Sequence, residues 1–118
     1  METDINSITN EFIMQSVSKG KKYTLVLLKA GKNRNQNPEE TDKIQMEHLR
    51  YLFKLRAEKK LLLNGPLLNN DVIVGIGIYD STDIEEVKRL TEGDPAFKAG
   101  RLDYEVYEWF GLPGDLLV

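Results

Sequence analysis

Apolar and polar residues recur with two different periods along the chain, and these periods separate predicted helices from predicted strands. Apolar side chains three or four residues apart indicate an amphipathic helix, whereas short continuous apolar runs indicate buried strands. The helical spacing covers residues 3–18, 37–58 and 82–92. The short apolar runs cover residues 23–28, 61–64, 72–79 and 102–109. We therefore expect three main helices and four strands.

Local signals indicate where these helices begin and end. Asn37-Pro38 combines a good N-cap with a residue suited to the first helical position. Thr82 opens a Thr-Asp-Ile-Glu capping box, which predicts the next helix start. Gly93 is typical of a helix end, and Asp94-Pro95 then opens one further short turn.

The predicted order is one helix followed by βαββαβ, which is the order of a ferredoxin-like α+β domain. Right-handed crossovers place both main helices on one face of a four-stranded antiparallel sheet. We expect residues 21–118 to form this domain and residues 1–20 to form an N-terminal amphipathic helix extension, packed on the domain or on a partner. Because the opposite sheet face is apolar and uncovered, we expect a homodimer or a higher homo-oligomer.

The helix predicted over residues 37–58 has an unusually wide apolar arc. Met46, Leu49 and Phe53 extend this arc beyond what contact with a sheet requires. Packing by the N-terminal helix and packing by a second subunit explain the arc equally well.

Composition narrows the class of protein. Of the 118 residues, 41% are hydrophobic and 30% are charged, which is typical of one soluble globular domain. The net charge is -3 and the only dense basic run, residues 19–22, is short, so we expect no nucleic-acid partner. The absence of cysteine excludes disulfides and metal–thiolate sites. No apolar run approaches the roughly 20 residues of a membrane span, and the polar N-terminus is unlike a signal peptide, so we expect a cytoplasmic protein without membrane contact.

The only histidine, His48, stands in the middle of an apolar helix face. At about 100° per residue, four apolar or aromatic neighbours on the same helix point within roughly 60° of His48. These neighbours are Ile44, Tyr51, Leu52 and Leu55. A titratable ring on such a face needs a polar partner or stays unsatisfied. The best candidate partner is Asp94, at the Gly-Asp-Pro break.

The positions of His48 and Asp94 along their helices predict that the two side chains lie at similar height above the sheet, within reach of contact. We expect the two main helices to follow parallel central strands and to run side by side in the same direction. His48 lies 11 residues past Asn37, and Asp94 lies 12 past Thr82, so both sit about 16–18 Å along their elements. A carboxylate on one ring nitrogen fixes the tautomer, and the other nitrogen can then take or give a proton near neutral pH.

Both residues also have structural explanations. Asp94 before Pro95 is an excellent N-cap followed by a first-turn proline, which explains the pair of residues without catalysis. A single histidine on an apolar face is more often a satisfied core residue than a catalyst. The sequence pattern leaves both interpretations open.

The remaining motifs give no sign of a cofactor or a metal. Gly75-Ile76-Gly77 lacks the third glycine and the following helix of a dinucleotide fingerprint. Its two glycines leave one strand face bare, either for a closely packed helix or for a ligand. Turn and cap positions explain Asp71, Asp80 and Asp83. The only alternative metal site is then one formed by the single histidine together with carboxylates. We therefore expect no cofactor and no metal.

Several segments together resemble the YciI-like (YCII-related) family over about residues 23–110. They are LLKAG at 27–31, QMEHL at 45–49, LLNGPL at 62–67, GIGI at 75–78, and GDP with KAG within 93–100. The resemblance implies a ferredoxin-like dimeric α/β barrel. It also implies a His–Asp active site, which falls here on His48 and Asp94.

Further candidate ligand contacts surround this pair. We expect the pocket in the cleft between sheet and helix near Gly65 and Pro66. Arg34, Arg101 and Tyr79 are candidates for contacts with an anion or a ring, and each has an alternative role as a surface or packing residue.

Two functions fit these features. The first is a small-molecule enzyme of lyase, isomerase or hydrolase type, with His48 as general acid or base and Asp94 as its orienting partner. The alternative is a non-catalytic dimeric module that binds a small acidic or aromatic ligand or supports an assembly.

Overall fold

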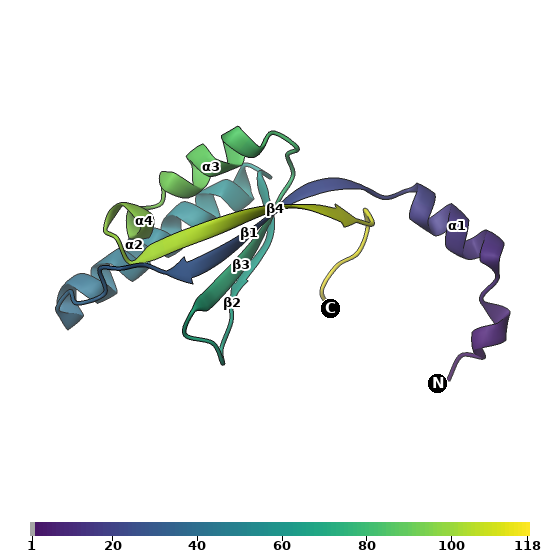
Figure 1. The fold of residues 1–118 in the computed structure, drawn as a ribbon, viewed down its shortest axis with the longest axis horizontal. Coiled ribbons are helices and arrows are strands. Elements are labelled where there is room, and N and C mark those ends of the chain that lie inside the picture. Colours follow the sequence, from purple (N-terminus) through teal and green to yellow (C-terminus); the bar gives the residue numbers. More distant parts are fainter. Residues whose placement is uncertain (1) are drawn as a thin grey trace.

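The computed structural model describes residues 2–118 as a sheet with helices on one face and a projecting N-terminal segment (Figure 1). In chain order the elements are η1 (Ile5–Ser7), α1 (Asn10–Ser18), β1 (Lys21–Ala30), α2 (Pro38–Ala57), β2 (Leu61–Pro66), β3 (Ile73–Tyr79), α3 (Ile84–Glu92), α4 (Pro95–Lys98) and β4 (Leu102–Gly111). The helix predicted over residues 3–18 is divided in two, because Ile8 and Thr9 have extended backbone conformations between η1 and α1.

The four strands form one antiparallel sheet in the order β2-β3-β1-β4. The helices α2, α3 and α4 lie together on one face of this sheet (Figure 1). The predicted ferredoxin-like α+β fold is therefore confirmed.

The central strands run in opposite directions. β1 and β3 pair antiparallel, with Val26 opposite Gly77. Each main helix returns along the strand that precedes it, so α2 and α3 also run in opposite directions. The prediction that these helices run in the same direction is wrong, because it assumed parallel central strands.

Side-chain caps account for the N-terminal ends of the helices. The Asn37 side chain accepts a hydrogen bond from the Glu40 backbone at 2.8 Å, and Pro38 follows in the first turn of α2, as predicted. At α3 the cap is Asp83 and not Thr82, so that prediction was displaced by one residue. The Asp83 carboxylate is the stronger acceptor for the positive end of the helix dipole.

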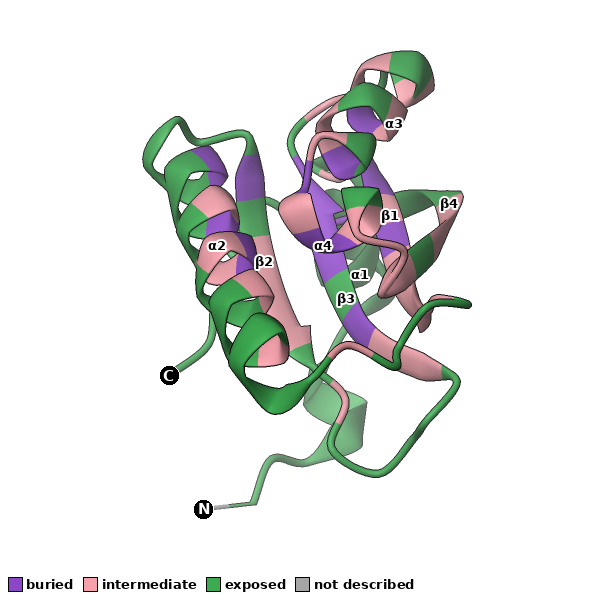
Figure 2. Cartoon of the chain, turned by 90° about the vertical axis from the view of Figure 1, so that its left-hand side faces the viewer, coloured by how far each residue is buried: buried purple, intermediate pink, exposed green. Residues whose placement is uncertain are grey.

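A small hydrophobic core lies between the helices and the sheet. Its most buried members come from both layers and are Val26, Leu52, Leu55, Leu61, Tyr79 and Val87. Figure 2 shows the buried residues gathered where α2 and α3 face the strands. This contact fixes the height of α2 above the sheet and thus the direction in which its central side chains point.

The opposite face of the sheet carries no helix (Figure 1). Because Val26 belongs to the core under the helices, its neighbours Leu25 and Leu27 point to the opposite face. Tyr107 and Trp109 of β4 share that face through their pairing with β1 and are 45% and 39% exposed. Among residues 2–118, this apolar face is therefore left open by the helices, as the sequence predicts.

The N-terminal segment extends away from the domain (Figure 1). No residue of α1 is buried, and Met46 and Phe53 on α2 remain 56% and 64% exposed. The interpretation that the N-terminal helix covers the wide apolar arc of α2 is therefore wrong. In the part of the chain that the structure describes, no helix is both long and apolar enough to cross a membrane.

Candidate active site

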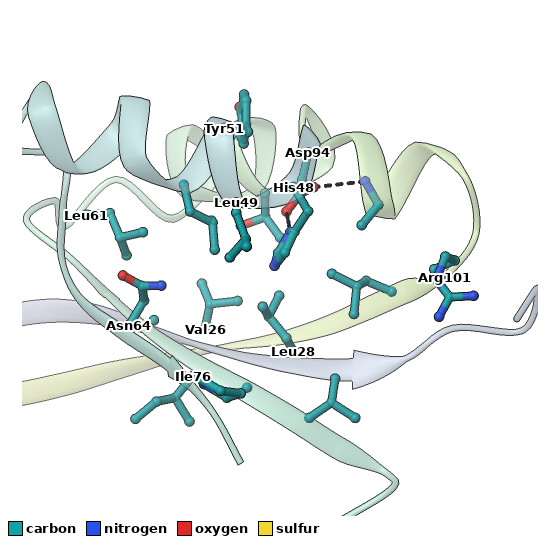
Figure 3. A pocket seen from close by; sticks show the side chains of 18 of the residues that line it. Val26, Leu28, His48, Leu49, Tyr51, Leu61, Asn64, Ile76, Asp94 and Arg101 are labelled. Carbon is teal, nitrogen blue, oxygen red and sulfur yellow. Dashed lines mark hydrogen bonds and ion pairs between the residues drawn. The ribbon is translucent and has the colours of Figure 1, made fainter. Parts of the chain in front are cut away.

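A cavity of about 250 Å³ lies between α2 and the sheet. It is lined by α2, by the strands beneath it and by residues around the junction of α3 and α4 (Figure 3). The residues that the sequence indicated as catalytic or ligand-binding all line this one cavity, namely His48, Asp94, Arg34, Gly65, Pro66, Tyr79 and Arg101.

His48 projects from the centre of α2 toward the sheet (Figure 3). Only 9% of the residue is exposed, because it follows the same helix face as the core residues Leu52 and Leu55. Its Nδ1 atom lies 2.6 Å from Oδ2 of Asp94. The imidazole therefore has the polar partner that its burial requires.

Asp94 is held where α3 ends and α4 begins. Gly93 is the C-cap of α3, and Asp94 is the N-cap of α4 with Pro95 directly after it. Oδ1 of Asp94 accepts a hydrogen bond from the backbone of Ala96 at 2.9 Å, while Oδ2 contacts His48. The capping and pairing interpretations of Asp94 are thus both correct, because each uses a different carboxylate oxygen.

The two residues meet for a reason other than the one the sequence suggested. His48 is close to the middle of α2, which spans 20 residues. A residue in the middle of a helix has nearly the same height above the sheet whichever way the helix runs. The end of the antiparallel α3, which has nine residues, therefore still reaches the level of His48.

The hydrogen bond to Asp94 determines the state of the imidazole. A carboxylate oxygen only accepts, so Nδ1 of His48 donates and Nε2 of the neutral ring is left with a free lone pair. Nε2 faces the cavity (Figure 3). Within residues 2–118, every fully buried side-chain nitrogen and oxygen has a hydrogen-bond partner. This arrangement presents a proton acceptor to a molecule in the cavity.

Two tyrosines flank the pair and remain protonated at neutral pH. The Tyr51 hydroxyl donates to the Leu90 carbonyl at 2.7 Å, which joins α2 to α3. Burial raises the pKa of Tyr51, and the nearby Asp94 carboxylate raises it further. Burial also raises the pKa of Tyr79 to about 12. Tyr79 lines the cavity but is only 4% exposed, so it is mainly a core residue.

Asn64 of β2 is a cavity residue that sequence reasoning missed. Its Oδ1 accepts a hydrogen bond from Nη1 of Arg56 at 2.8 Å. This bond turns the amide nitrogen toward the cavity (Figure 3). The signal in the sequence was a polar residue that ends the apolar run Leu61-Leu62-Leu63.

The glycines of β3 form part of the cavity wall. Gly75 and Gly77 pair with Leu28 and Val26 and so face α2. The atoms closest to a Cβ placed on either glycine belong to strand residues, and Leu61 Cδ1 would lie 3.3 Å from a Cβ on Gly77. No helix packs on these glycines, so their bare face contributes space to the cavity.

Metal-binding side chains do not gather here. Among residues 2–118, no three His, Asp or Glu side chains lie close enough to hold a metal ion together.

Comparison with known proteins places the chain in a family. The model of the YCII-related domain matches residues 23–110. The chain belongs to this family. No curated protein matches the sequence.

Solved structures support the fold of this family member. One is 5-chloro-2-hydroxyhydroquinone dehydrochlorinase from Burkholderia phenoliruptrix AC1100, solved as a complex with 2,5-dihydroxybenzoquinone. It is 24% identical with a TM-score of 0.55, over 73% of this chain and 92% of that chain. Muconolactone isomerase is 12% identical with a TM-score of 0.62, over 81% of this chain and 96% of that chain. The YCII-related protein thus shares the fold of these two structures.

Proposed function

We propose that this YCII-related protein is a small-molecule enzyme that transfers a proton in an elimination, an isomerisation or a hydrolysis. His48 acts as the general acid or base, and Asp94 orients it. The observation that carries the proposal is the 2.6 Å contact between Nδ1 of His48 and Oδ2 of Asp94, with Nε2 turned to the cavity.

The chemistry follows from this geometry. Nε2 removes a proton from the substrate or from water, and Asp94 stabilises the resulting imidazolium through the existing hydrogen bond. In an isomerisation the imidazolium returns the proton to a different atom of the substrate. In an elimination the electrons of the broken C–H bond form a double bond, and the leaving group departs with its own electron pair.

The similar structures support a reaction of this class. The names of both describe enzymes, one a dehydrochlorinase and the other an isomerase. The dehydrochlorinase was solved with a dihydroxybenzoquinone, which is a small ring of a size suited to a cavity of about 250 Å³.

Deuterium exchange tests the proposed proton transfer without knowledge of the full reaction. Small cyclic ketones and lactones, with and without a carboxylate, are incubated with the protein in D₂O, and incorporation into carbon is followed by NMR. We expect the wild type to accelerate exchange in some of these compounds, and His48→Asn and Asp94→Asn to abolish the acceleration. Equal exchange with wild type and His48→Asn, or no acceleration by wild type across the set, contradicts the proposal.

The alternative function is a binding module without catalysis. The apolar cavity with hydrogen-bonding groups on its walls favours it, because such a cavity binds a ligand whether or not a reaction follows. In that case a ligand raises the melting temperature of wild type and His48→Asn equally and undergoes no exchange with either.

We also propose that the protein forms a homodimer through the open sheet face. That face carries Leu25 and Leu27 with exposed Tyr107 and Trp109, and an apolar face of this kind favours a symmetric partner. Light scattering tests this proposal: the wild type should have twice the monomer mass of 13.5 kDa. Leu27→Lys should give monomers, whereas Leu68→Lys, the same change in the exposed turn after β2, should not. A monomeric wild type, or a dimeric Leu27→Lys, contradicts it.

A further inference from the structure

We infer that the ligand of this cavity is a small cyclic carboxylate whose carboxylate binds Arg34 and Arg101 and whose ring carries a further oxygen that binds Asn64. The inference deepens the proposed function by naming the substrate class of the same site. It rests on the hydrogen-bonding groups that the cavity walls present.

Two guanidinium groups stand at one end of the cavity. Arg34 and Arg101 both line it, and none of the salt bridges found among residues 2–118 involves either of them. None of these salt bridges among residues 2–118 involves an arginine, and Arg34 and Arg101 differ from the other arginines because they line the cavity. A ligand carboxylate would supply the missing charge in the bidentate geometry that guanidinium favours.

Loop contacts hold these arginines in place. Nη1 of Arg34 donates to the Arg101 carbonyl at 2.5 Å, and Nη1 of Arg101 donates to Oε1 of Gln36 at 2.8 Å. Gln36 and Asn33 both donate to the Ala99 carbonyl at 3.2 Å. The bonds from Arg34 and Arg101 each use one of the five N–H groups of a guanidinium, so several donors on each arginine remain for a ligand. The anion site is thus organised before the ligand arrives.

Asn64 supplies a donor at the other end. Its carbonyl oxygen is engaged by Arg56, so the amide nitrogen that faces the cavity only donates (Figure 3). In Figure 3, Asn64 and Arg101 lie on opposite sides of His48. A ligand that contacts both ends therefore passes the His48 side chain, which lines the same cavity.

Apart from Nε2 of His48, these polar groups favour a ligand that accepts hydrogen bonds. Both oxygens of Asp94 are engaged, by His48 and by Ala96, and the Tyr51 hydroxyl donates to Leu90. The donors that remain include the two guanidinium groups and the Asn64 amide. Binding of a cationic ligand is unfavourable, because the cation would lie near two arginines and no free carboxylate.

Size and shape favour a ring. Val26, Leu28, Gly75 and Gly77 line the cavity without polar side-chain atoms. An apolar cavity of about 150 Å³ holds benzene, so a cavity of about 250 Å³ has room for a ring with two or three substituents.

Binding of matched probes tests the inference independently of catalysis. The probes are benzoate, 3-hydroxybenzoate and 4-hydroxybenzoate, each compared with its neutral amide by calorimetry. We expect at least one carboxylate to bind wild type about tenfold or more tightly than its amide, since a charge-assisted contact is lost in the amide. Arg34→Gln combined with Arg101→Gln should remove this preference. Arg50→Gln, on the exposed face of α2 and outside the cavity, should keep it.

His48→Asn separates this inference from the proposed function. We expect this variant to retain the preference for the carboxylate within about threefold, since His48 is not part of the anion site. If exchange chemistry fails while the carboxylate preference persists, the proposed reaction is wrong and the ligand class stands. Equal binding of carboxylate and amide, no binding of any carboxylate, or an unchanged preference in the double arginine variant overturns the inference. If Arg101→Gln unfolds, Arg101→Lys takes its place, because lysine keeps the positive charge but lacks the paired N–H groups of the guanidinium. Weaker binding of the carboxylate by the folded Arg101→Lys variant then supports the inference.

Discussion

His48 and Asp94 are 46 positions apart in the sequence, yet Nδ1 of one and Oδ2 of the other are 2.6 Å apart. The carboxylate is fixed from the other side by the Ala96 backbone, so it cannot rotate away without uncapping α4. Because the same residue begins a helix and orients the imidazole, the geometry of the pair depends on the local backbone. This coupling makes the site testable by substitutions at one position.

Asp94→Asn should invert the tautomer of His48 while preserving the fold. The amide oxygen takes over the cap on Ala96, so the amide nitrogen faces Nδ1 of His48 and donates to it. The imidazole proton then moves to Nε2, which removes the proton acceptor from the cavity. ¹⁵N NMR of the ring should report Nδ1–H in the wild type and Nε2–H in the variant at alkaline pH. The same tautomer in both proteins would contradict the assignment.

Asp94→Ala should destabilise the protein by more than the loss of a cap. We expect the free energy of unfolding to fall by about 3 kcal/mol, because the variant loses the cap and leaves a buried imidazole without its partner. Asp83→Ala is the matched control, since Asp83 caps α3 without a second side-chain contact from Oδ2. Asp83→Ala should lower the free energy of unfolding, measured with denaturant, by about 1 kcal/mol. Equal losses would show that the pair contributes nothing to stability.

Tyr79 should make the protein less stable at alkaline pH. Burial raises the pKa of Tyr79 to about 12, above the value of about 10 in the unfolded chain. The folded state therefore retains a proton that the unfolded state releases, and this stabilisation is complete below pH 10 and lost as the pH rises toward 12. Its full size is about 2 to 3 kcal/mol. Denaturant unfolding at pH 9 and pH 11 should show a smaller decline for Tyr79→Phe than for wild type.

Two truncations on α2 should separate its core face from its outer face. Leu55 is 1% exposed in the core, so Leu55→Ala should cost about 2 to 5 kcal/mol of unfolding free energy. Met46 is 56% exposed, so Met46→Ala should change stability by less than about 0.5 kcal/mol. Urea titration measures both. A comparable loss for Met46→Ala would mean that a partner covers the outer arc of α2.

Periodicity was sufficient to locate the elements but not their directions. The strands and helices fall close to the predicted ranges, because each range has a continuous pattern and local end signals such as Asn37-Pro38. The shift of a cap from Thr82 to Asp83 reflects two adjacent residues that can both act as caps. The antiparallel pairing of β1 with β3 involves contacts between distant residues, and hydrophobic spacing does not record such pairings.

Asn64 shows most clearly what spacing alone could not reveal. Residues three apart in a regular strand point to opposite faces. The pairing of β2 with β3 shifts between Leu61 and Leu63, so Leu61 lies opposite Tyr79 and Asn64 opposite Gly77. Both therefore face α2, one in the core and the other in the cavity. A strand register is a property of two paired strands, so the bulge is not visible in the sequence of one of them.

The sequence by itself determined the order of the elements, the place of His48 on the apolar face of α2 and the role of Asp94 as a cap. These follow from residues close together in the chain, whose geometry depends on helix and strand periods. Only the tertiary structure decided that Asp94 meets His48, and that Arg34, Arg101 and Asn64 line the same cavity. Strand order, register and the packing of α2 and α3 on the sheet bring these distant residues together.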